Sequence, residues 1–121
     1  MPPRKQSPRT RRVADRIQLE LGEILATRTE DPRLRTLTVT GAEVTRDLSS
    51  AKIWVSGTLA KADEPHVLQA LARAAPYFRT LLAPRLQLRI VPVLTFQFDH
   101  SIEAGARIEQ LLREIQEPRD E

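Results

Sequence analysis

The stretch from Leu68 to Phe98, LQALARAAPYFRTLLAPRLQLRIVPVLTFQF, most constrains how this chain of 121 residues can fold. Its apolar residues first recur at helical spacing and then, after Pro84, alternate as in a strand. Proline has no backbone N–H and its ring crowds the carbonyl four residues back, so we expect the helix to bend at Pro76. This stretch therefore predicts a first helix to Ala75, a kink at Ala74, Ala75 and Pro76, a short helix from Tyr77 to about Ala83, and a strand over residues 88–98.

The residues before this stretch predict a helix and a β-hairpin. Ser7-Pro8 is typical of a helix start, and an apolar stripe then runs to about Thr27. Two alternating segments follow, over about 36–44 and 51–59, joined by a turn at 45–50. The inward-facing register of the first segment changes before Val44, which predicts a bulge at Gly41-Ala42. Pro92 in the last strand favours an edge position or a second bulge.

The end of the chain predicts one more helix. Asp99 and Ser101 are suitable capping residues for it, and apolar residues recur from Ile102 to Ile115. The order becomes α-β-β-α-kink-α-β-α: an α+β fold, a two-layer sandwich with a three-stranded sheet and helices on one face. We expect residues 1–8 to be a disordered basic arm, 9–116 a single domain, and 117–121 a frayed acidic tail.

Composition narrows the class of protein. A chain of this length can bury a core as one domain, and it contains no cysteine, which excludes disulfides and thiolate metal sites. The apolar runs are too short for a membrane span and no signal peptide is recognisable, so we expect a cytoplasmic monomer without cofactors.

Charge is distributed unevenly along the chain. Residues 1–16 carry six basic side chains and one acidic one, whereas residues 99–121 carry seven acidic and three basic ones. No acidic residue falls between Arg73 and Phe98. A positive front and a negative tail predict a polyanionic partner that meets one end of the molecule.

Arginines therefore dominate the candidate RNA-binding residues, because the guanidinium group binds phosphate oxygens in a bidentate manner. Arg9, Arg12 and Arg16 fall on one arc of the first helix, beside its apolar stripe. Such a run is often only a solvated face, but no acidic residue compensates it within that arc. The candidates are Arg9, Arg12, Arg16, Arg46, Lys52, Arg73, Arg79, Arg85 and Arg89.

Trp54 lies on the face of its strand that the alternation marks as polar. It could stack on a base, but a lone tryptophan is more often covered by side chains of neighbouring strands, and we favour that interpretation.

Signs of catalysis are missing from the sequence. The four glycines are isolated, so there is no phosphate-binding loop or dinucleotide fingerprint, and neither His66 nor His100 has a second histidine at metal-ligand spacing. We predict a protein that is not an enzyme.

Five separated segments, in order, resemble the ribosome-binding factor A family: RRVADRIQLEL (11–21), DPRL (31–34), TRDLSSAKIWVS (45–56), RIVPVLTFQFDHS (89–101) and GARI (105–108). The resemblance implies a type II K-homology-like fold in which an alanine-centred kink replaces the Gly-x-x-Gly clamp. Ala74-Ala75 stand at that kink, with Pro76 where many relatives have glycine.

The same resemblance implies a non-catalytic factor of ribosome biogenesis, linked to cold adaptation. Such a factor binds the free immature 30S subunit and assists late maturation and processing of 16S rRNA. Small-subunit proteins and assembly GTPases are further implied partners. The alternative is a protein–protein adaptor that docks on a ribosomal protein or an assembly GTPase without recognising rRNA directly.

Overall fold

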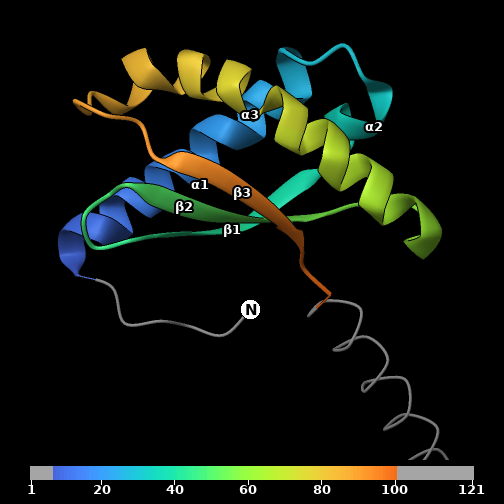
Figure 1. Cartoon of the computed structure of the whole chain (residues 1–121), viewed down its shortest axis with the longest axis horizontal. Coiled ribbons are helices and arrows are strands. Elements are labelled where there is room, and N and C mark those ends of the chain that lie inside the picture. Colours follow the sequence, from blue (N-terminus) through green and yellow to red (C-terminus); the bar gives the residue numbers. More distant parts are fainter. Residues whose placement is uncertain (1–6, 101–121) are drawn as a thin grey trace, which may run out of the picture.

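The computed structural model describes residues 7–100, which form one sheet covered on one face by helices (Figure 1). The elements are α1 (Pro8–Thr27), α2 (Pro32–Arg35), β1 (Thr38–Val44), β2 (Ser50–Ser56), the short 3-10 helix η1 (Lys61–Asp63), α3 (Glu64–Leu86) and β3 (Val93–Phe98). This order confirms the predicted α+β class. The predicted final helix, with Gly105 and the acidic tail, lies outside the described residues, as do residues 1–6 of the arm predicted over 1–8.

The sheet has the order β1-β2-β3. β1 and β2 are antiparallel, whereas β2 and β3 are parallel and are connected through α3. The pairing of β1 shifts between Val39 and Gly41, so the strand has a bulge, which lies at Thr40, one residue before the predicted Gly41-Ala42. β3 is an edge strand, and it begins at Val93, so Pro92 precedes the strand instead of interrupting it.

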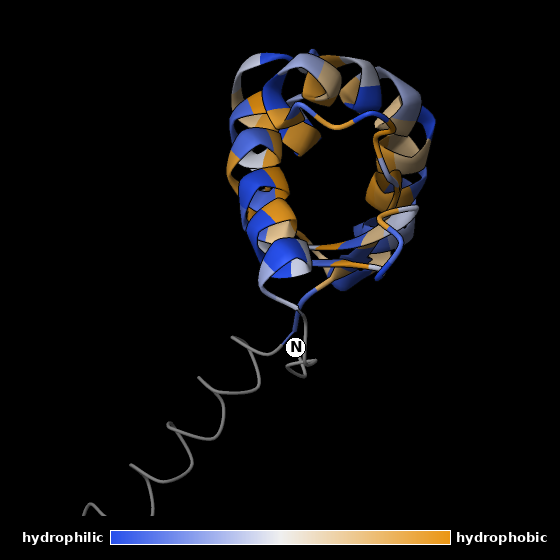
Figure 2. Cartoon of the chain, turned by 90° about the vertical axis from the view of Figure 1, so that its left-hand side faces the viewer, coloured by the Kyte–Doolittle hydropathy of each residue, from blue (hydrophilic) through white to orange (hydrophobic). Residues whose placement is uncertain are grey.

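The helices bury their apolar faces against the inner face of the sheet. Figure 2 shows the hydrophobic residues of helices and strands turned toward the space between the two layers. Ile17, Ile53, Leu71 and Phe78 are all fully buried there. Such a core is the main source of stability in a fold of this size.

Local signals set the helix starts. Ser7 Oγ accepts a hydrogen bond from the amide of Thr10 at 3.3 Å, and Pro8 occupies the first position of α1, as predicted. Asp31 caps the four-residue helix α2, where its carboxylate accepts from the amide of Arg33 at 3.0 Å. The sequence pattern predicts only a break at Asp31-Pro32 and misses α2.

The predicted break at Pro76 and the helix end at Pro84 are wrong, because α3 continues through both prolines. A stripe of buried residues crosses the first proline without interruption: Val67, Leu71, Ala75, Phe78 and Leu82. Both prolines are exposed, so their rings lie on the solvent side of α3 and do not interrupt the buried stripe. Figure 1 shows that α3 changes direction near its middle, so the bend occurs within one helix.

The predicted strand over 88–98 is also too long. Leu88 and Ile90 lie in the loop before β3, and the side chain of Ile90 is 68% exposed. The alternation of apolar residues therefore extends beyond the true strand.

Candidate nucleic-acid interface

Three segments that are distant in the sequence meet at one end of the molecule: the start of α1, the β1–β2 turn and the loop between α3 and β3 (Figure 1). A cleft of about 240 Å³ lies among them and is lined by Arg9, Asp47, Leu48, Ser49, Leu88, Arg89 and Ile90. Arg12 belongs to the first turns of α1 and Arg46 to the same β-turn, and both are exposed. We call Arg9, Arg12, Arg46 and Arg89 the basic end.

The cations of the basic end are available to an anion. None of these four arginines forms a salt bridge with another residue of the described part of the chain. The acidic side chain that lines the cleft, Asp47, accepts hydrogen bonds from residues of its own turn. Its Oδ1 accepts from Thr45 Oγ1 at 2.8 Å, from Ser49 Oγ at 2.7 Å and from the Ser49 amide at 3.1 Å. These hydrogen bonds, the one from the Ser49 hydroxyl first, lower the pKa of Asp47.

Arg16 and Arg85 lie elsewhere and share an acidic partner. Arg16 Nη2 is 2.8 Å from Glu20 Oε2, and Arg85 Nη1 is 3.1 Å from Glu20 Oε1 and 3.3 Å from Glu23 Oε1. No acidic residue lies within the arc of Arg9, Arg12 and Arg16, yet Glu20 follows Arg16 one turn later and compensates its charge. Arg85 therefore lies in the contact between α3 and α1.

Arg79 supports the backbone of the loop before β3. Its Nη2 donates to the carbonyl of Val91 at 2.8 Å, and the side chain is half-buried. Lys52 lies on the outer face of the sheet, with Nζ 5.8 Å from the centre of the Trp54 ring. Trp54 is only 9% exposed, so its ring offers no open face to a base, in agreement with the favoured interpretation.

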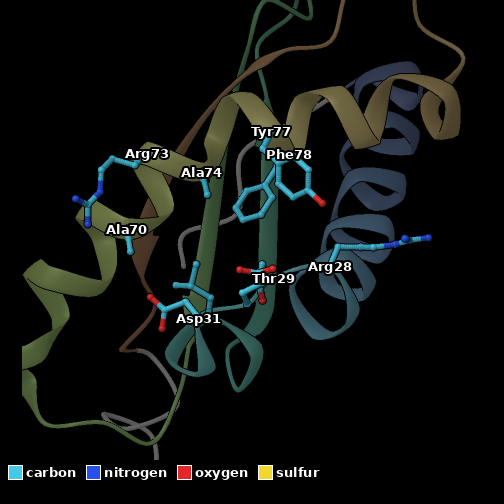
Figure 3. A pocket seen from close by; sticks show the side chains of 10 residues that line it. Arg28, Thr29, Asp31, Ala70, Arg73, Ala74, Tyr77 and Phe78 are labelled. Carbon is cyan, nitrogen blue, oxygen red and sulfur yellow. The ribbon is translucent and has the colours of Figure 1, made fainter.

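Arg73 lies far from the basic end, beside a second and larger cavity (Figure 3). This cavity measures about 500 Å³ and lies between the C-terminal end of α1, the short helix α2 and the middle of α3. We call it the α2 cavity. Because α1 has 20 residues, the two sites are about 30 Å apart along that helix.

The sequence alone identifies part of each site. It points to Arg9, Arg12, Arg46, Arg89 and Arg73, but nothing in the pattern shows that Arg9 and Arg89 line one cleft. It misses Tyr77 and Arg28 in the α2 cavity. The sequence signal that could have pointed to this cavity is Tyr77, the single tyrosine of the chain, directly after Pro76.

A metal site and a membrane-spanning helix were both sought in the described residues. Between residues 7 and 100, no three His, Cys, Asp or Glu side chains gather as a metal site would require. None of the helices in that range has the length and apolar character needed to cross a membrane.

Comparison with known proteins agrees with the fold. The family described as ribosome-binding factor A matches residues 9–112. Ribosome-binding factor A of Thiobacillus denitrificans is 41% identical over 122 residues, which cover 97% of this chain and 98% of that protein.

One solved structure and one homology model of relatives are similar as well. The crystal structure of ribosome-binding factor A from Thermus thermophilus has a TM-score of 0.64 at 28% identity, covering 73% of this chain and 93% of that one. Coordinates of the Thermus thermophilus factor fitted into a cryo-EM map of a 30S complex give a TM-score of 0.61 at 29% identity, covering 72% of this chain and 91% of that one. With a family match that spans most of its length, the chain belongs to the ribosome-binding factor A family.

Proposed function

We propose that this protein binds the free immature 30S subunit through its basic end and there assists late maturation of 16S rRNA. The observation that carries the proposal is the cleft in which Arg9 and Arg89, 80 positions apart in the sequence, are exposed together. Arginine forks around a concave surface suit the phosphates of a folded RNA, which proteins recognise largely by shape and backbone. A Thermus thermophilus relative has been fitted into a map of its complex with the 30S subunit, which supports the same target for this chain.

The role is binding without catalysis, as in the family to which the chain belongs. A protein that neutralises rRNA phosphates can favour one arrangement of a junction by binding it better than the alternatives. Because its target is assembled in the bacterial cytoplasm, the protein acts there. The single domain proposed for residues 9–116 needs no second copy to form the basic end.

We rank the nine candidate cations by whether each side chain already has a partner within the fold. Arg9, Arg12, Arg46 and Arg89 have no ionic partner among the described residues and are placed first. Arg73 is placed with the α2 cavity. The other four, Arg16, Lys52, Arg79 and Arg85, already have partners within the fold and are assigned a structural part.

Co-sedimentation with separated 30S, 50S and 70S particles, at several salt concentrations, tests the proposal. We expect selective recovery with 30S subunits, and binding that weakens steeply as salt is added. The double variant Arg9→Ala/Arg89→Ala should bind less tightly at every salt concentration. The plot of log K against log salt should also become less steep, by about one unit of slope for each phosphate that is no longer neutralised.

A matched control is the double variant Arg35→Ala/Lys61→Ala. It removes the same charge from exposed side chains that do not line the cleft of the basic end. It should leave the salt slope unchanged. Equal effects of the two double variants would mean that net charge alone governs binding, and the proposed interface would be wrong.

The adaptor alternative is favoured by one observation: Ile90, which lines the cleft, is 68% exposed, and Val93, three residues later, is 52% exposed. Exposed apolar side chains of this size suit a protein surface. Under that alternative, Ile90→Ser would release the protein from 30S subunits, whereas Arg9→Ala/Arg89→Ala would leave binding to naked 16S rRNA fragments unaltered.

A further inference from the structure

The α2 cavity has the composition of a site for a ring-shaped ligand. Its apolar part is contributed by Leu34, Ala70 and Phe78, all of which are buried in the core. Tyr77 also lines it, yet the tyrosine is 49% exposed. A volume of about 500 Å³ falls within the range of sites that hold small organic groups.

Tyr77 supplies the exposed aromatic surface against which another ring could lie, because the ring of Phe78 is fully buried. Figure 3 shows the rings of Tyr77 and Phe78 extending from α3 toward Thr29 and Asp31 on the opposite side of the opening. The two rings are 6.2 Å apart between centroids and inclined at 47°, so they do not stack on each other. The half-exposed tyrosine therefore retains a surface on which a planar group can stack.

Two cations flank this wall. Arg28 and Arg73 both line the cavity, and in Figure 3 their side chains extend outward on opposite sides of it. Neither forms a salt bridge with any residue from 7 to 100. The cavity thus has an apolar interior and an aromatic wall, with a positive charge at each side.

Two acidic side chains, Asp31 and Glu30, also line the cavity. Asp31 is held by Arg33, whose Nη2 lies 2.8 Å from Asp31 Oδ2 and whose Nε lies 3.2 Å from Oδ1. This contact, through its side-chain hydrogen bonds first, lowers the pKa of Asp31, so the carboxylate stays ionised and can accept a hydrogen bond from a base amino group. Glu30 is exposed to solvent.

We propose that the α2 cavity receives one unpaired nucleotide of ribosomal RNA. The base stacks on Tyr77 above the apolar interior, and the phosphates on either side of that nucleotide meet Arg28 and Arg73. Single-stranded RNA is commonly bound in this way, by an aromatic platform for the base and cations for the backbone. The inference rests on the proposed function, since it adds a second contact to the same RNA target about 30 Å from the basic end.

A nucleotide fits these features better than a peptide side chain does. A peptide aromatic ring would use Tyr77 and the apolar interior but would leave both arginines without a counter-ion. An acidic peptide would satisfy the arginines but would leave the apolar interior empty. The nucleotide is the ligand class that carries a planar ring between two anionic groups.

A nuclear magnetic resonance titration tests the site without the ribosome. The full chain would be titrated with penta-adenylate, penta-cytidylate and penta-uridylate, each of which offers a base flanked by phosphates. We expect saturable shifts at Arg28–Asp31 and Ala70–Phe78 with at least one of these oligonucleotides. Because Tyr77 is the only tyrosine of the chain, its ring signals report the stacking directly.

Binding to 30S subunits supplies the second readout. Tyr77→Ala should weaken the complex about 5- to 150-fold while the salt slope stays unchanged, because loss of a stacked base releases no counterion. Tyr77→Phe keeps the ring and should bind like the wild type. Both variants change a half-exposed side chain, so the fold should survive, and the phenylalanine variant controls for packing.

Each outcome decides between the two proposals. If Tyr77→Ala binds 30S subunits normally and no oligonucleotide shifts the cavity, the cavity is no nucleotide site, although the basic end still stands. If Tyr77→Ala weakens binding but the oligonucleotides produce no shifts, a protein group occupies the cavity, and the inference is wrong. If the wild type fails to bind 30S subunits, the proposed function is wrong, and shifts at the cavity would then support the nucleotide site alone.

Discussion

Arg85 Nη1 lies 3.1 Å from Oε1 of Glu20, an ion pair between residues 65 positions apart that joins α3 to α1. The carboxylate of Glu20 is largely buried, with 11% of its side chain exposed, and it is also bound by Arg16. Arg16 and Arg85 thus supply the ionic partners of a carboxylate that has little contact with water.

Arg85→Ala should lower the free energy of unfolding by about 1–2 kcal/mol, because Glu20 would keep one of its two cations in a partly buried position. Arg16→Ala should cost less than about 1 kcal/mol, since Arg16 is 55% exposed and Arg85 would remain. Urea unfolding of the two variants measures this difference. A larger loss from Arg16→Ala would show that Arg85 is not the main partner.

A second prediction concerns the end of α3. Gln87 closes the helix in the left-handed conformation, with φ 55° and ψ 33°, and it is exposed. Glycine adopts this conformation without a Cβ clash, so Gln87→Gly should raise the free energy of unfolding by about 0.5–1 kcal/mol. Ala83→Gly, at an exposed position inside the same helix, should lower it by about 1 kcal/mol. Thermal unfolding of both variants would show opposite changes if the cap conformation is correct.

The β1–β2 turn should respond to pH through Asp47. Its folded pKa is lowered from the ordinary value of 3.8, so the ionised carboxylate stabilises the folded state fully above that value. The contribution is lost as the pH falls below 3.8 through the lowered folded pKa. The difference in Tm between the wild type and Asp47→Ala should thus be constant above about pH 5 and shrink below 3.8.

This comparison needs the variant because Asp31, whose pKa is also lowered, titrates in the same range. Both proteins lose the Asp31 contribution together, so it cancels in the difference. A Tm difference that stayed constant down to about pH 2 would contradict the role assigned to the Asp47 carboxylate.

The bend of α3 gives a fourth prediction. Pro76→Ala restores an amide that can donate to the carbonyl four residues earlier, and should raise the free energy of unfolding by about 1 kcal/mol. It should also weaken binding to 30S subunits if the bend sets the position of Tyr77. Pro84→Ala, another exposed helix proline but away from the α2 cavity, should stabilise without changing binding. Equal binding by both variants would show that the surrounding core, and not Pro76, fixes the cavity.

Local patterns were sufficient for most of the fold. Alternation and turn residues predicted the hairpin and the bulge beside Gly41, and Ser7-Pro8 predicted the start of α1. The break predicted at Pro76 was wrong because a proline on the exposed side of a helix costs only local hydrogen bonds. The buried stripe from Val67 to Leu82 continues past it. Whether the stripe or the proline prevails depends on the neighbouring elements, which the sequence alone does not show.

The candidate interface was harder to predict from the sequence than the fold, for a related reason. A sequence shows which side chains are cationic but not which of them have a partner across the core. Glu20 is far from Arg85 along the chain, so nothing local distinguished Arg85 from Arg89. The α2 cavity combines residues 28–34 with 70–78, and only the packing of α2 against α3 brings those segments together.

The parallel pairing of β2 with β3 has a consequence for the order in which the protein is made. The hairpin of β1 and β2 involves neighbouring residues and can form early, whereas Ser50 pairs with Val93 only after all of α3 has been synthesised. The loop that carries Arg89 reaches its place through that same pairing. A nascent chain can therefore form its first helix and hairpin before the cleft exists. The proposed contact with small subunits becomes possible only once the last strand has paired with β2.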